Sequence, residues 1–138
     1  RSPRHGDICD VFTELVGIAE LLAHPHLEVE VVLVREEEYR IHSSDGPWRR
    51  KGWMVVERRL VEIVEAVSFH GGGDLARLLP PDLPEAFTTA DLALQTGLSQ
   101  RTAQQMAYCL RKVGAIDGVG KVGNAVTYRL AAGEAYAP

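Results

Sequence analysis

Residues 88–131, TTADLALQTGLSQRTAQQMAYCLRKVGAIDGVGKVGNAVTYRLA, decide the fold, because they predict a helix, a tight turn, a second helix and a glycine-bearing hairpin in that order. Thr88 and Asp91 form a capping box, with a shorter acid than the preferred Glu, and predict a helix over about residues 89–96. Gly97 can adopt the left-handed conformation that ends a helix. About three residues therefore join the two helices.

The second helix is expected to begin at Ser99, whose hydroxyl can cap its first backbone N–H groups. Its apolar residues fall three and four apart and predict one buried stripe, made of Ala103, Met106, Ala107, Leu110 and Val113. Its other side carries amides and cations without a carboxylate, in Gln100, Arg101, Gln104, Gln105, Tyr108, Arg111 and Lys112. Such a face suits the major groove of DNA, because Gln pairs with adenine, Arg with guanine, and Lys or Arg with phosphate.

Two short strands are expected after this helix, over residues 115–116 and 126–130. The turns between them are assigned to glycines, namely Gly118, Gly120 and Gly123. Lys121 and Asn124 are expected near the tip of this hairpin.

Residues 88–131 resemble winged helix-turn-helix domains, with residues 99–113 in the position of the recognition helix and residues 117–126 in that of the wing. The phrase LRKVGAI followed by a glycine hairpin is typical of that superfamily, whose members most often bind duplex DNA, while others use the fold for protein contacts. ERRLVEIVE, LPEAFTTADLA and QQMAYCLRKVGAI also resemble the carboxy-terminal part of uncharacterised bacterial proteins that carry a winged helix after another domain. That second resemblance implies no activity.

The resemblance and the side-chain types together assign expected DNA contacts. Base contacts are expected from Gln100, Arg101, Gln104 and Gln105, and Tyr108 is expected to contact a sugar or a thymine methyl group. Phosphate contacts are expected from Arg111, Lys112, Lys121 and Arg129, with Asn124 added at the wing. Double-stranded DNA is the expected partner, transcription regulation the expected use, and no metal or other cofactor is expected.

The distribution of charge supports this interpretation. The chain of 138 residues has 15 basic and 19 acidic residues, a formal net charge of −4. Residues 88–131 hold five basic and two acidic residues, a net charge of +3, whereas the rest holds 10 basic and 17 acidic residues, a net charge of −7. A positive segment on a negative chain suits a local nucleic-acid contact. Because five cations are few, a homodimer or a further nucleic-acid-binding segment is expected to supply more affinity.

Composition is that of a soluble globular protein, with 46% hydrophobic and 25% charged residues. The sequence has no run of 18 apolar residues and no secretory signal, so we expect a cytoplasmic location and no membrane contact. Cys9 and Cys109 lie far apart, and reduced cysteines are favoured over a disulfide. The opening RSPRHGD is typical of a linker and predicts a longer protein with an upstream domain.

The sequence predicts two domains, at residues 1–53 and 54–138. The first is expected to be a helix and antiparallel sheet layer, with a helix over residues 8–23 that Pro25 ends. Three short strands are expected there, over residues 27–34, 39–42 and 48–53, with a turn cluster at 43–47.

The second domain is expected to be the winged helix-turn-helix. Apolar residues at helical spacing predict a helix over residues 54–67, and they are Val56, Leu60, Ile63, Val64 and Val67. We favour this helix as the first of the winged domain, with Phe87 and Thr88 as its small first strand, over a place in the amino-terminal layer. Gly71, Gly72 and Gly73 predict a break, followed by a short helix that Asp74 caps and that ends at Leu79.

Other clusters favour plain structural explanations. Residues 48–53, WRRKGW, combine cations and aromatic rings that suit nucleic acid, but a surface hairpin pinned by its tryptophans is favoured. The run Glu36-Glu37-Glu38 favours a solvated loop, because hard-metal sites need oxygens from separated positions. The pair His24 and His26 favours a helix-ending turn, because no Cys or carboxylate falls at supporting spacing.

The sequence carries no GxxxxGK, GxSxG or CxxC motif, and the chain is predicted not to be an enzyme, although an upstream domain could be one. We therefore expect an α+β protein, a winged helix-turn-helix preceded by a small helix-plus-antiparallel-sheet layer, that acts as a DNA-binding or DNA-targeting module. Two alternatives stay open. One is a protein-interaction or dimerisation module, and the other is an accessory domain of a nucleic-acid-processing enzyme.

Overall fold

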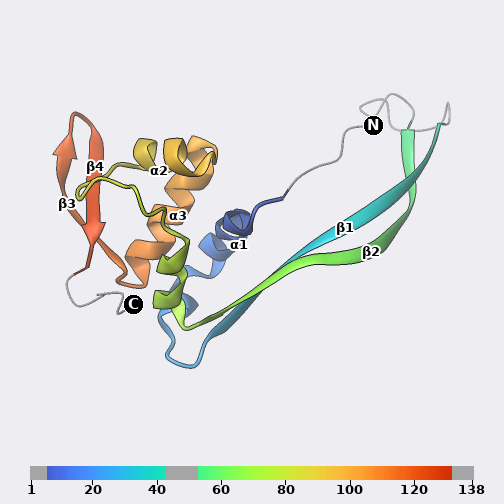
Figure 1. The fold of residues 1–138 in the computed structure, drawn as a ribbon, viewed down its shortest axis with the longest axis horizontal. Helices are drawn as coiled ribbons and strands as arrows, with labels where there is room; N and C mark the ends of the chain where they lie inside the picture. Colours follow the sequence, from blue (N-terminus) through green and yellow to red (C-terminus); the bar gives the residue numbers. More distant parts are fainter. Residues whose placement is uncertain (1–5, 43–52, 132–138) are drawn as a thin grey trace. The chain divides into compact units, whose positions relative to one another are not determined.

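The computed structural model describes residues 6–42 and 53–131 and has a mixed α+β architecture with two small two-stranded sheets (Figure 1). With η denoting a 3-10 helix, its elements are η1 (Ile8–Val11), α1 (Phe12–Leu15), η2 (Val16–Ala23), β1 (Glu28–His42), β2 (Trp53–His70), η4 (Gly72–Leu78), α2 (Thr89–Thr96), α3 (Gln100–Lys112), β3 (Ile116–Val122) and β4 (Ala125–Leu130). The predicted α+β class is therefore confirmed.

The chain divides into two compact units, and the first is discontinuous in sequence. Residues 1–31 and 68–138 form the first unit, whereas residues 32–67 of the β1–β2 hairpin form the second. This division differs from the predicted one, into residues 1–53 and 54–138. The difference arises because the amino-terminal helical segment packs against α3, which lies in the same unit.

The core of the first unit lies between the amino-terminal helical segment, η1 to η2, and α3. The segment contributes the buried side chains of Cys9, Phe12, Leu15, Ala19 and Leu22, three or four residues apart. Helix α3 contributes Ala103, Met106, Ala107, Cys109 and Leu110. Burying one Leu or Phe side chain stabilises a fold by about 1.5–3 kcal/mol relative to leaving it exposed, so this contact is a major source of stability.

Helices α2 and α3 follow the sequence prediction closely. The Thr88 hydroxyl oxygen accepts from the Asp91 backbone N–H at 3.2 Å, and the Asp91 carboxylate accepts from the Thr88 N–H at 2.9 Å. Gly97 ends α2 with a φ of 78°, and the Ser99 hydroxyl caps α3 by accepting from the Thr102 N–H at 3.1 Å. The capping box, the left-handed glycine and the serine cap are all confirmed.

Strands β3 and β4 form an antiparallel hairpin that closes through Gly123, at a φ of 61°, and Asn124. Gly118 and Gly120 do not form the turn as predicted, because they lie within β3 on either side of a bulge. Phe87 joins this hairpin by a single bridge to Tyr128 of β4, with N–H to carbonyl distances of 2.8 and 2.7 Å. Of the small strand predicted at Phe87 and Thr88, Phe87 forms this single bridge, whereas Thr88 is the N-cap of α2.

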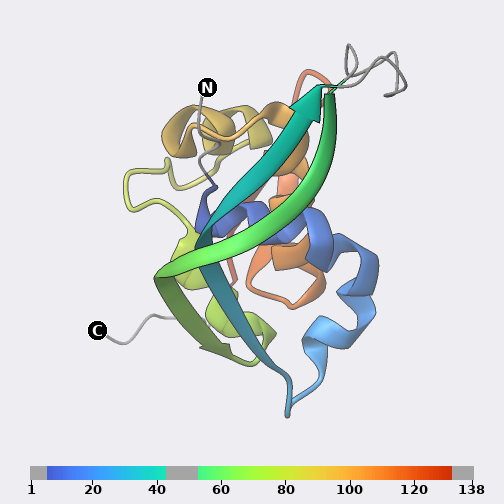
Figure 2. The same cartoon turned by 90° about the vertical axis from the view of Figure 1, so that its right-hand side faces the viewer.

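The helix predicted over residues 54–67 is wrong, because these residues lie in β2, which pairs with β1 (Figure 2). Apolar residues three and four apart also occur on a strand whose two faces are both apolar, so the spacing alone was ambiguous. Valine and isoleucine dominate this stretch, and β-branched side chains favour strands. The two strands predicted over residues 27–34 and 39–42 are likewise one strand, β1.

The amino-terminal helix occupies the predicted residues but is mostly 3-10 helix, with a non-helical residue at Ile18. Two of its apolar residues, Ile18 and Leu21, are 44% and 56% exposed. The short helix η4 also differs, because it begins after Gly71 and Asp74 lies inside it and does not cap it. The turn predicted at 43–47 and residues 48–52 of the WRRKGW cluster lie outside the described residues.

Candidate nucleic-acid interface

The exposed face of α3 is the candidate nucleic-acid interface. The buried stripe holds Ala103, Met106, Ala107 and Leu110 as predicted, with Val113 half-buried just after the helix. The other side exposes Gln100, Arg101, Gln104, Tyr108, Arg111 and Lys112, while Gln105 is half-buried. The helical phase inferred from the sequence is therefore confirmed. It leaves a face of amides and cations without a carboxylate, because α3 contains no Asp or Glu.

Two of the glutamines are constrained by their surroundings. The side-chain amide of Gln100 donates to the hydroxyl of Thr89 at 2.7 Å and so links the first turns of α2 and α3. The Oε1 atom of Gln105 is buried, and the part of the chain that the structure describes offers it no hydrogen-bond partner. Gln104 is exposed next to them. Of the three amides, Gln104 is therefore the best placed to meet an external ligand.

The cations at the carboxy-terminal end of α3 surround a shallow hollow. Tyr108, Arg111 and Lys112 line a volume of about 320 Å³. The Lys112 ammonium lies 5.9 Å from the centre of the Tyr108 ring and 3.7 Å from a carboxylate oxygen of Glu20. This ion pair is solvent-exposed, and such pairs contribute only about 0–1 kcal/mol. An anion that approaches the hollow can therefore compete with Glu20 for Lys112.

The hairpin separates the two cations that were predicted to act together on phosphate. Lys121 pairs with Val126 across the sheet, so the two side chains share a face. Arg129 lies three residues after Val126 on the same strand and so points to the opposite face. It lies 3.8 Å from a carboxylate oxygen of Glu85. Lys121 and the exposed Asn124 remain candidates at the tip of the hairpin, and Arg129 does not join them.

Arg129 instead lines a separate cavity of about 550 Å³. The walls are mostly apolar and come from η4, the proline-rich segment after it and the end of β4, including Leu79, Leu83, Phe87 and Leu130. The sequence did not indicate this cavity, because its walls come from segments about 50 residues apart. The only signal was the unusual density of proline between residues 80 and 84.

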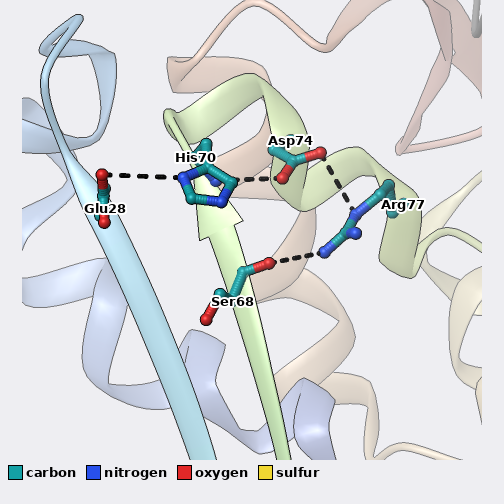
Figure 3. Close-up of polar contacts among 5 residues, drawn as sticks. All are labelled: Glu28, Ser68, His70, Asp74 and Arg77. Atoms are coloured by element: carbon teal, nitrogen blue, oxygen red, sulfur yellow. Dashed lines mark hydrogen bonds and ion pairs between the residues drawn. The ribbon is translucent and has the colours of Figure 1, made fainter.

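A second feature that the sequence did not indicate is a polar network at the base of the β1–β2 hairpin (Figure 3). Glu28 of β1 lies 3.7 Å from His70 Nδ1, and the His70 backbone N–H donates to Asp74 at 3.0 Å. Arg77 lies 3.2 Å from Asp74, donates to the Ser68 carbonyl at 2.9 Å and stacks 4.7 Å from the centre of the Phe69 ring. The network ties η4 to the ends of both strands.

The two cysteines of the chain are buried thiols in the first unit. Burial raises the pKa of the Cys9 thiol from 9.0 to about 12 and that of Cys109 to about 11, so both stay protonated at neutral pH. Both cysteines are free. Residues 6–42 and 53–131 contain no group of three His, Cys, Asp or Glu side chains that could hold a metal ion, and no helix among them is long and apolar enough to cross a membrane.

The structure thus defines an α+β protein whose first unit presents an amphipathic helix beside a short hairpin. A family model described as a domain of unknown function, DUF8091, matches residues 1–70, and the chain belongs to that family. The match ends with β2 and so includes the amino-terminal helical segment and the β1–β2 hairpin.

One relative is similar in sequence to this chain over both of its halves. An uncharacterized protein of Treponema pallidum (strain Nichols) is 31% identical over 129 residues, which cover 94% of this chain and 51% of that protein. The chain therefore spans about half the length of this relative. No solved structure matches the chain significantly.

Proposed function

We propose that this chain is a DNA-binding or DNA-targeting module of the winged helix-turn-helix class. The observation that carries the proposal is the exposed face of α3, which presents Arg101, Gln104, Arg111 and Lys112 and contains no carboxylate. Major-groove readers need this combination, because amide and guanidinium groups pair with base edges while cations neutralise phosphates. The net charge of +3 over residues 88–131 of an acidic chain adds to it.

The arrangement of elements supports the same class. A helical segment packs behind α3, a three-residue turn joins α2 to α3, and a hairpin follows α3 directly. The bridge from Phe87 to Tyr128 adds the small first strand of a winged domain to the outer strand of that hairpin. In this proposal the first helix is the segment at residues 8–23, and the β1–β2 hairpin is inserted between it and α2.

The proposal divides the contacts by position. Arg101 and Gln104 lie in the first turns of α3 and would meet base edges, whereas Arg111, Lys112 and Lys121 would meet phosphates. Gln100 and Gln105 would contribute less, because one amide is bound to Thr89 and the other is half-buried. Arg129 is left out, because it points to the opposite face of the hairpin from Lys121.

A salt titration of duplex binding tests the proposal. Fluorescence anisotropy with a random duplex should give an affinity that falls with salt, and the double variant Lys112→Glu, Lys121→Glu should weaken it at least tenfold, because each reversal replaces a phosphate contact by repulsion. Both side chains are exposed, so unfolding should change by about 0.5 kcal/mol or less. Single-stranded DNA and RNA of equal length are run in parallel.

Arg129→Glu is the matched control, because it reverses the same charge on the opposite face of the hairpin. We expect its effect on duplex affinity to be clearly smaller than that of Lys121→Glu alone. Equal losses from both single variants would show that only the overall charge matters. Duplex affinity that is unchanged in the double variant would remove the DNA proposal.

A second candidate function is a protein-interaction module. It is favoured by the apolar side chains that the β3–β4 hairpin exposes, since Val119, Val122 and Val126 are 44%, 68% and 37% exposed. Exposed apolar patches mark protein contacts more often than DNA contacts. Val122→Thr separates the two functions, because it removes apolar surface without a charge. Loss of a protein partner with unchanged duplex affinity would favour this second candidate.

A further inference from the structure

The cavity beside Arg129 has the size and the lining of a small-molecule site. Its volume of about 550 Å³ falls within the range of roughly 300–1,000 Å³ that such sites occupy. The lining is apolar apart from three charged side chains, Arg77, Glu85 and Arg129, and all of it belongs to the first unit. Cavities with apolar walls hold organic molecules in preference to water. The lining therefore favours an organic ligand with a large apolar part.

The segments that line the cavity are held in place by the rest of the first unit. Ala76 of η4 is buried in the core, and its carbonyl accepts from the Leu79 N–H at 3.0 Å. Phe87 is also buried, and two backbone hydrogen bonds of 2.8 and 2.7 Å join it to Tyr128 of β4. Prolines at positions 80, 81 and 84 lie between them, and their rings fix the backbone φ angle. A cavity that is already formed reduces the entropy lost when a ligand binds.

The two arginines of the lining differ in how fully the chain occupies them. The guanidinium of Arg77 lies 3.2 Å from the Asp74 carboxylate and donates to the Ser68 carbonyl at 2.9 Å (Figure 3). Among the described residues, the guanidinium of Arg129 has a polar contact with Glu85 alone, at 3.8 Å. Charge-assisted hydrogen bonds are about 2.7–2.9 Å long, so this contact is an ion pair without a hydrogen bond. Arg129 therefore has N–H donors to offer to an anion.

We propose that this cavity binds a small organic carboxylate, whose apolar part fills the cavity and whose carboxylate pairs with Arg129 in place of Glu85. The planar guanidinium can hold a carboxylate through two parallel hydrogen bonds. The Glu85 side chain is 88% exposed, and exposed ion pairs contribute little to stability, so Glu85 can leave at small cost. An organic cation would meet two guanidinium groups and one carboxylate, which favours an anion.

The carboxylate proposal does not rest on the DNA proposal, because Arg129 has no part in the expected DNA contacts. Octanoate is the probe, and octanamide is its neutral counterpart with the same number of non-hydrogen atoms. Each is titrated into the full chain at neutral pH without DNA. Octanoate should saturate with a Kd of about 1 mM or below, as ligands of this size can reach. Octanamide should bind at least about tenfold more weakly, because it lacks the charge that Arg129 pairs with.

NMR spectra of the ¹⁵N-labelled chain locate the bound probe. The largest shifts of backbone amide signals should fall on Leu79, Leu83, Phe87 and Leu130, which line the cavity. Val122 is the internal reference, because it is apolar and 68% exposed but lies outside the lining. Equal shifts at Val122 would show unspecific adsorption of the alkyl chain and would overturn the proposal. This measurement needs no variant.

Two substitutions should change octanoate affinity in opposite directions. Arg129→Gln should weaken it at least about tenfold and leave octanamide binding unchanged, because only the charge-assisted pair is lost. Glu85→Gln should strengthen it about two- to fivefold, because the competing carboxylate is removed. Both side chains are exposed, so both variants should fold.

Arg35→Gln is the matched control. Arg35 is exposed and forms an ion pair with Glu62 at 3.0 Å, but it lies outside the cavity. It should leave octanoate affinity unchanged. Failure of octanoate to saturate up to about 10 mM would overturn the proposal. So would equal affinity for octanamide, a neutral effect of Arg129→Gln, or an equal loss in Arg35→Gln.

Discussion

Gly72 is tightly packed. A Cβ atom at this position would lie 2.0 Å from the carbonyl oxygen of Leu22 and 2.5 Å from a methyl group of Val113. Backbone cannot move aside as a side-chain end can, so η4 approaches the amino-terminal helical segment this closely only because residue 72 is glycine. The sequence had suggested a simple break at this glycine run.

Gly72→Ala should therefore destabilise the fold by about 1–3 kcal/mol or more, as overpacking does. Gly17→Ala is the matched control, because nothing lies within 4 Å of a Cβ atom there and the residue lies in a helix. It should stabilise by about 0.4–1 kcal/mol. Urea denaturation of both variants measures the difference. If Gly72→Ala proves neutral, the contact between η4 and Leu22 is looser than described.

Alanine variants of Gln104 and Arg111 should distinguish sequence-specific base contacts from charge attraction in DNA binding. Gln104 is exposed in the second turn of α3, where a recognition helix meets base edges, and a bidentate pair there discriminates bases by about 1–3 kcal/mol. Gln104→Ala should relax the preference at one position of a selected site and leave the salt dependence intact. Arg111→Ala should weaken all sequences and reduce the salt slope by about one.

Selection from random duplexes, followed by binding at several salt concentrations, provides the measurement. Both side chains are exposed, so both alanine variants should keep the wild-type stability within about 0.5 kcal/mol. If no sequence is enriched and both variants behave alike, the chain binds DNA without reading it, and the proposal of a sequence-specific module must be dropped.

At the scale of elements, α2 and α3 were predictable because their signals are local. A capping box, a left-handed glycine and a serine cap act within a few residues, and the stripe on α3 has one period only. Strand β2 was not predictable in this way. Its apolar residues fit two periods, and only pairing with β1, which the local spacing does not report, decides between them.

The candidate interface was also predictable only where its features are local. The sequence correctly separated the exposed and buried sides of α3, because helical phase is a local property. It could not show that Gln100 binds Thr89, that Lys112 faces Glu20 or that Arg129 turns away from Lys121. Each of these facts depends on packing between separate elements. For that reason fewer of the residues expected to contact DNA remain candidates, although the exposed face of α3 is the one predicted.

At the scale of the whole molecule, the first unit forms its buried core from residues outside the segment 32–67. The Gly71 N–H donates to the Leu27 carbonyl at 2.7 Å, and Glu28 faces His70, so the two chain segments already lie side by side where the hairpin leaves the unit (Figure 3). The buried contacts of α3 come from residues 9–22, η4 and the carboxy-terminal half.

Replacing residues 32–67 by Asn-Gly, a sequence that closes two antiparallel strands, should leave the first unit folded. Circular dichroism should keep the helical signal, and thermal unfolding should stay cooperative. A chain of residues 71–138 alone serves as the comparison, because it lacks Phe12, Leu15 and Leu22 and should lose the fold. An unfolded deletion variant would mean that the hairpin is needed for the core.

The pairing of Leu27 with Gly71 also bears on how fast the chain reaches its native state. Bringing together two points 44 positions apart in a flexible chain costs about 3 kcal/mol of entropy beyond a constant, and the search is slow. Strands that zip together residue by residue divide this search into small steps, each rewarded at once, on a timescale of about 1–10 μs for a short hairpin. We therefore expect zipping of β1 on β2 to bring the amino-terminal helical segment to α3 and to precede their packing.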